Sequence, residues 1–287
     1  ANSLNNLAVL YGNMGQYEKA EPLYIQALSI RKKALGDNHP SYANSLNNLA
    51  GLYETMGQYE KAEPLNKELI EIQKKTLGEG DPAYANSLNN LAVLYVNMGQ
   101  YEKAEPLYIK AKDIRKKALG ENHPSYANSL NNLATLYKFM GQYEKAESLY
   151  ILAIDIRKNV LGESHPDYAF SLNDLAALYA NMGQYEKAEP LYLESLKIRK
   201  KVLGETHSDY AFSLNNLAVL YTSMGQYEKA EPFYILAREI WRKALGANHP
   251  TYAFSIHNLA VLYANMGQYE KAEPLYQRSL AIREKAL

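Results

Sequence analysis

The chain has 287 residues, and its 31 basic and 31 acidic side chains leave it with no net charge. A neutral chain lacks the positive field by which proteins bind nucleic acids and anionic membranes, so neither partner is expected. The absence of cysteine excludes disulfides and thiolate metal sites, and it is compatible with the reducing, cytoplasmic location that we expect.

An unchanged eight-residue sequence, MGQYEKAE, organises the chain. It begins at Met14 and returns every 42 residues, at Met56, Met98, Met140, Met182, Met224 and Met266. Repetition at this period is typical of an array in which each unit packs only on its neighbours. We therefore predict a single domain over residues 1–287, with units 1–42, 43–84, 85–126, 127–168, 169–210, 211–252 and 253–287.

Each unit begins with a predicted helix, which runs from about Pro40 to Met56 in the first complete copy. Proline suits the first helical position, and His39 before it is the expected N-cap. In the amino-terminal copy, the apolar face follows helical spacing at Leu4, Leu7, Ala8, Tyr11 and Met14. Gly15 is expected to end this helix.

A second helix is predicted from Tyr17 to Leu35, where Gly36 stops it. Glu18 lies in its first turn and the basic run 31–33 in its last turn, as the helix dipole favours. Two helices in each of seven units give fourteen helices, and the sequence therefore predicts an all-α fold built from helix-turn-helix units.

These units resemble the tetratricopeptide repeat. The large and small positions of that repeat match Leu4, Leu7, Ala8, Tyr11, Ala20, Tyr24 and Ala27. The usual repeat has about 34 residues, and the longer form here, with LGDNHP from Leu35 and LNNLA from Leu46, is similar to the repeats of kinesin light chains. The resemblance implies a right-handed α-α superhelix whose first helices line a concave groove that holds extended peptides.

The face of each first helix that lies opposite the apolar stripe has almost no charge and many asparagines. Asparagine is a poorer helix former than alanine by roughly 0.5–0.7 kcal/mol, but its amide can pair with both N–H and C=O of a peptide. We predict peptide contacts at Asn5, Asn6, Asn44, Asn47, Asn48, Asn86, Asn89, Asn90, Asn128, Asn131, Asn132, Asn173 and Asn215. Two alternatives stay open: the repeated asparagines are functionally indifferent, or the second of each pair bonds to the adjacent unit.

The Asn2 position changes along the chain, from asparagine in the first four units to Phe170, Phe212 and Phe254 in the last three. An exposed row of aromatic side chains is typical of a contact site. We therefore add these phenylalanines to the predicted peptide site, with a polar amino-terminal half and an apolar carboxy-terminal half. The alternative is that the rings pack against the neighbouring unit and belong to the core.

Other signals favour structural interpretations. Histidine recurs once in most units, and caps explain it better than zinc, whose ligands must lie about 2.0–2.1 Å from one centre. The sequence contains neither a catalytic set nor a phosphate loop, so no enzyme activity, metal or cofactor is expected. The basic run at the end of each second helix is expected to form an exposed stripe, in which Trp241 replaces an arginine at the surface.

The leading hypothesis is a non-enzymatic scaffold that binds a peptide or protein partner. The alternative is a structural spacer or self-associating array without a groove ligand. The first and last units lack the polar caps that solenoids need for solubility, so end-to-end association is also expected. No apolar run approaches the ~20 residues that span a bilayer.

Overall fold

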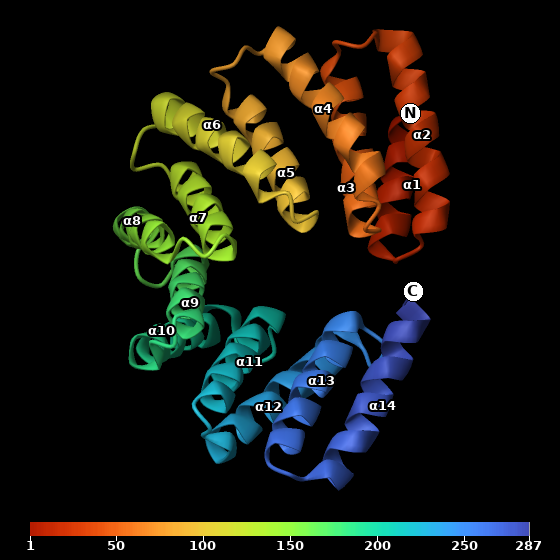
Figure 1. Cartoon of the computed structure of the whole chain (residues 1–287). Coiled ribbons are helices and arrows are strands. Elements are labelled where there is room, and N and C mark those ends of the chain that lie inside the picture. Colours follow the sequence, from red (N-terminus) through yellow and green to blue (C-terminus); the bar gives the residue numbers. More distant parts are fainter. Residues whose placement is uncertain (287) are drawn as a thin grey trace. The chain divides into compact units, whose positions relative to one another are not determined.

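The computed structural model describes residues 1–286, and within them every regular element is an α-helix (Figure 1). The first helix of each repeat has an odd number and the second an even number. The helices are α1 (Asn2–Asn13), α2 (Tyr17–Leu35), α3 (Pro40–Thr55), α4 (Tyr59–Thr76), α5 (Pro82–Asn97), α6 (Tyr101–Leu119), α7 (Pro124–Phe139), α8 (Tyr143–Leu161), α9 (Pro166–Asn181), α10 (Tyr185–Leu203), α11 (Ser208–Ser223), α12 (Tyr227–Leu245), α13 (Pro250–Asn265) and α14 (Tyr269–Ala286). The predicted all-α architecture of seven helix pairs is confirmed.

The chain forms two compact bodies, Ala1–Gly141 and Gln142–Leu287. The N-terminal body contains α1 to α7, and the C-terminal body contains α8 to α14. Within each body every helix packs against the helix before it and the helix after it. Each even-numbered helix between two others is therefore shared between its own repeat and the next one.

The helix ends follow from local chemistry. His39 caps α3, because its Nδ1 accepts a hydrogen bond from the backbone N–H of Ser41 at 3.1 Å. The same cap begins α7, α9, α11 and α13, and Asp81 takes the role at α5. Gly15 and Gly36 have φ angles of 71° and 85°, a region that favours glycine, and both lie just beyond a helix as predicted.

The core of each repeat combines small and large side chains at fixed positions. Ala8, Ala20 and Ala27 are fully buried, and so are most of their counterparts in later repeats. Without long side chains at these positions, the helix axes can approach closely. Tyr24 and Leu46 are also buried and fill the wider spaces, so the core continues from one repeat into the next.

A tyrosine of each later odd-numbered helix donates to a glutamate of the preceding even-numbered helix. The pairs are Tyr53–Glu21, Tyr95–Glu63, Tyr137–Glu105, Tyr179–Glu147, Tyr221–Glu189 and Tyr263–Glu231, at 2.6–2.9 Å. Burial and then the hydrogen bond to the carboxylate raise the pKa of Tyr53, Tyr137, Tyr179, Tyr221 and Tyr263 to about 12. These phenols hold neighbouring repeats together in their protonated form.

We expect the free energy of unfolding to fall as the pH rises from about 10 to about 12. Above pH ~10 the unfolded chain has released phenolic protons that the folded chain still binds. Rising pH therefore favours the unfolded state until the tyrosines of the folded chain ionise as well. Tyrosinate absorbance during a pH titration checks this, and Tyr179→Phe should remove one tyrosine from the late phase. A single ionisation phase near pH ~10, with the helices still intact, would contradict the prediction.

Candidate functional site

One exposed residue at the same position of each odd-numbered helix belongs to what we call the odd-helix stripe. The stripe consists of Asn2, Asn44, Asn86, Asn128, Phe170, Phe212 and Phe254, all of them exposed. The three phenylalanine side chains are 43–45% exposed, so they lie at the surface and outside the core. The stripe therefore changes from amides in the N-terminal body to aromatic rings in the C-terminal body.

Phe139 is a further exposed ring, at the end of α7. It stacks on Tyr101 of α6, with ring centroids 6.1 Å apart and planes 10° apart. The ring thus has one face against its neighbour within the N-terminal body.

The asparagines one turn further along the odd-numbered helices form an amide ladder between repeats. Four Nδ2 groups donate to Oδ1 of an asparagine in the preceding repeat, in the pairs Asn48–Asn5, Asn132–Asn89, Asn216–Asn173 and Asn258–Asn215, at 2.8–3.0 Å. This bond between units is the second alternative that the sequence left open. It gives these asparagines a structural role whether or not a ligand also contacts them.

The predicted peptide-contact asparagines differ in depth. Asn6 and Asn47 are exposed, whereas Asn5, Asn48, Asn89, Asn90 and Asn132 are half-buried. Asn131, Asn173 and Asn215 are only 2–3% exposed, so almost nothing of them reaches solvent. These three side chains do not lie on an open face as the sequence analysis expected.

In the N-terminal body, a hollow of about 330 Å³ lies between α1, α2 and α3. Asn47 and Asn48 line it together with Val9 and Gly51. Two of the predicted contact residues thus line the same hollow. Gly51 has no side chain to fill it.

The predicted basic stripe at the ends of the even-numbered helices is wrong for its arginines. Arg31, Arg115, Arg157 and Arg199 are only 4–9% exposed. Each donates from Nη1 to a serine of the next odd-numbered helix, as Arg199 does to Ser213 Oγ at 2.7 Å. Burial lowers the pKa of Arg115, Arg157 and Arg199, and the serine and carbonyl acceptors offset part of the desolvation.

The arginines also contact the odd-helix stripe. Nη2 of Arg31 donates to Asn2 Oδ1 at 2.9 Å, and Nη2 of Arg115 donates to Asn86 Oδ1 at 2.7 Å. In the C-terminal body the guanidinium of Arg157 lies 5.9 Å from the ring centroid of Phe170, within range of a cation–π contact. Where phenylalanine replaces asparagine at Phe170, the buried arginine therefore meets an aromatic ring in place of an amide oxygen.

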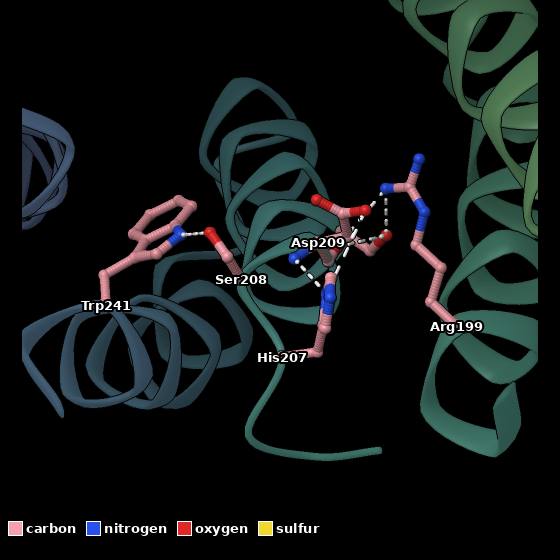
Figure 2. A network of polar contacts seen from close by, with 6 residues as sticks. Arg199, His207, Ser208, Asp209 and Trp241 are labelled. Carbon is pink, nitrogen blue, oxygen red and sulfur yellow. Dashed lines mark hydrogen bonds and ion pairs between the residues drawn. The ribbon is translucent and has the colours of Figure 1, made fainter. Parts of the chain in front are cut away.

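The surface position predicted for Trp241 is wrong as well. Its side chain is 1% exposed and packs on Tyr210, Ala211 and Leu214 of α11. The indole Nε1 donates to Ser208 Oγ at 3.0 Å, whereas Arg199 reaches α11 from α10 and donates to the carbonyl of Asp209 at 3.3 Å (Figure 2). Ser208 stands where most repeats have proline, so the two substitutions are coupled by this hydrogen bond.

Beside Trp241 lies a hollow of about 450 Å³ between α11, α12 and α13. Its lining includes Ser208, Asp209, Phe212, Trp241, Thr251 and Phe254. Sequence reasoning identified only the two phenylalanines. The paired departure from the repeat, tryptophan for arginine and serine for proline, is the signal that marks this place in the sequence.

Two classes of site have no counterpart in the described residues. Among them, no group of three or more histidine, aspartate or glutamate side chains is placed to hold a metal ion. None of the helices, as far as the structure describes them, is long and apolar enough to cross a membrane.

Comparison with known proteins finds the same repeat that the sequence resembles. The sequence profile described as "Tetratricopeptide repeat" matches residues 1–75, 83–159, 138–201, 169–234 and 209–285. No curated protein matches the chain by sequence.

Solved structures are similar along most of the chain. A variant of the nearly identical TPR-like repeats from a candidate kinesin light chain of Podosopora anserina is 32% identical with a TM-score of 0.63, over 70% of this chain and 95% of that one. BtubC (BKLC) from P. vanneervenii is 27% identical with a TM-score of 0.62, over 80% and 89% of the two chains. The apo form of RapI, 17% identical over 99% and 97%, has a TM-score of 0.70 and shares the fold.

The amide ladder makes a prediction for stability. Asn216→Ala should lower the free energy of unfolding by about 1–3 kcal/mol, because it leaves the buried Oδ1 of Asn173 without its donor. Chemical denaturation measures the change. Asn44→Ala is the matched control, since Asn44 is exposed and an exposed substitution should stay within about 0.5 kcal/mol. Equal effects of the two substitutions would show that the ladder bond contributes nothing.

Proposed function

We propose that this chain, which belongs to the tetratricopeptide repeat family, is a protein-binding scaffold. Its odd-numbered helices would bind an extended segment of a partner protein. Proteins of this family are generally protein-interaction scaffolds, and repeat arrays offer long surfaces for such binding. The observation that carries the proposal is the exposed odd-helix stripe, which contains no charged side chain.

The absence of charge matters because binding must remove water from the surface. The odd-numbered helices of the N-terminal body carry only two charged side chains, Glu54 and Lys138. Desolvating amides and rings costs less than desolvating ions. In the N-terminal body a peptide can therefore exchange water for amide hydrogen bonds at Asn44 and Asn47, and in the C-terminal body the stripe offers apolar contact at Phe212.

The asparagines take two parts in this proposal. Exposed amides such as Asn44, Asn47 and Asn128 lie where a peptide backbone can reach them. Buried amides such as Asn173 and Asn215 act indirectly, because their ladder bonds fix the spacing between neighbouring odd-numbered helices. The repeat distance of the stripe, and hence the register of the bound peptide, follows from that spacing.

A second candidate is self-association without a groove ligand. In α1, Leu7, Leu10 and Met14 are exposed, although the equivalent Leu49 and Leu52 of α3 are buried by the preceding repeat. Leu280 of α14 is also exposed. These apolar side chains occupy positions that are packed against a neighbouring repeat elsewhere in the chain. If this candidate is correct, light scattering should show an average molecular mass that rises with protein concentration.

Peptide-library selection against the intact chain tests the scaffold proposal. We expect Phe212→Asn with Phe254→Asn to preserve helical content, because both rings are exposed, and to weaken binding of the selected peptide by about tenfold or more. The matched control is Leu193→Asn with Leu236→Asn, two even-helix side chains with similar exposure of 42% and 41%. Equal loss in both double variants, or failure to select any saturable binder, would contradict the proposal.

A further inference from the structure

The hollow between α11, α12 and α13 lies entirely within the C-terminal body. We propose that it is a subsite for a cationic side chain, an arginine or lysine of the bound partner segment. This inference rests on the proposed function and adds a chemical class of ligand to it. It is carried by the aromatic lining, by a carboxylate and by the loss of an internal arginine.

Aromatic side chains form most of the apolar lining. Phe212 and Phe254 are each 43% exposed, and Trp241 lies beside them with its indole N–H already bonded to Ser208. The faces of such rings attract ammonium and guanidinium groups, most strongly for tryptophan. The rings can also cover the aliphatic stem of a basic side chain, which is longer than that of aspartate or glutamate.

The lining has one ionisable group, the carboxylate of Asp209. The Asp209 side chain is 62% exposed, and the buried Arg199 is a nearby cation. His207 Nδ1 lies 3.9 Å from Asp209 Oδ2 and accepts a hydrogen bond from the Asp209 backbone N–H. Arg199 donates to the backbone carbonyl of Asp209 (Figure 2). Because the Asp209 side chain is mostly exposed, its carboxylate keeps acceptor positions for a ligand. The odd-numbered helices on both sides of the hollow, α11 and α13, contain no lysine and no arginine.

The hollow also lies where the repeat normally places its own arginine. Arg199 of α10 bonds to the Asp209 carbonyl and to Ser213 at the start of α11. One repeat later the equivalents are Trp241, Thr251 and Ser255. Trp241 turns back to Ser208, Thr251 lines the hollow, and Ser255 Oγ donates to the carbonyl of Tyr252 at 2.7 Å. A guest cation would therefore occupy the position that the substitution of arginine by tryptophan vacated.

Trp241 is the chain's single tryptophan, so its fluorescence reports directly on this hollow. The probes are four capped pentapeptides with two alanines on each side of a central arginine, citrulline, leucine or glutamate. We expect a saturable change in Trp241 emission with the arginine peptide, weakened by added salt. Citrulline, which keeps the shape and loses the charge, should bind about tenfold more weakly, and glutamate more weakly still.

Three variants test which groups of the hollow hold the cation. Asp209→Asn should weaken the arginine peptide about five- to tenfold and leave the citrulline peptide unchanged. Asp167→Asn is the matched control, because Asp167 has the same place after the His165 cap of α9 and does not line the hollow. Trp241→Arg should abolish arginine binding, measured by anisotropy of a labelled peptide, because the restored side chain fills the hollow itself.

Several results would overturn the subsite. They are equal binding of the arginine and citrulline peptides, no response to either, or equal effects of Asp209→Asn and Asp167→Asn. A library-selected peptide that binds the intact chain and is insensitive to Asp209→Asn would remove this inference and leave the scaffold function standing. Failure to select any peptide would count against the scaffold function itself.

Discussion

A single helix pair has too little depth to bury its own apolar faces, so the structure depends on the contact between neighbouring repeats. Fully buried alanines such as Ala20 and Ala27 let the helices approach, and Leu46 and the tyrosines fill the remaining space. The Tyr–Glu hydrogen bonds repeat at each junction with nearly constant length. The core positions of each repeat must therefore fit both their own repeat and the next.

The same requirement explains why one residue type serves different purposes at adjacent positions. Asn44 and Asn48 lie one helical turn apart, and Asn44 faces solvent whereas Asn48 bonds back to Asn5. An amide is suited to both places because it can donate and accept in either. A buried amide pair costs little once both groups are satisfied, and its directionality fixes how neighbouring helices align.

Several departures from the repeat in the C-terminal body are linked by contacts. Phenylalanine replaces asparagine in the stripe, where the ring of Phe170 meets the buried Arg157. Trp241 replaces an arginine, and Ser208 replaces the proline that begins most odd-numbered helices, with one hydrogen bond joining them. Because the helix lengths and caps are unchanged, these substitutions alter the chemistry of the surface without altering the array that presents it.

The sequence alone determined the helices, their limits and the family. The caps, the glycine stops and the spacing of large and small residues are properties of a few consecutive residues, and the 42-residue period carries them through the chain. The tetratricopeptide resemblance and its longer, kinesin light chain-like form were confirmed by comparison. For Phe212 and Phe254 the sequence left two possibilities, an exposed row or a place in the core, and the structure shows both rings exposed.

Only the tertiary structure decided how deep the remaining side chains lie. Helical periodicity places Asn47 and Asn173 on the same face, yet the first is exposed and the second is covered by neighbouring helices. It placed Arg199 and Trp241 in an exposed stripe, although both are buried against α11. The reason is physical: the period of one helix gives the direction of a side chain, whereas the packing of the adjacent repeat decides whether water or protein meets it there.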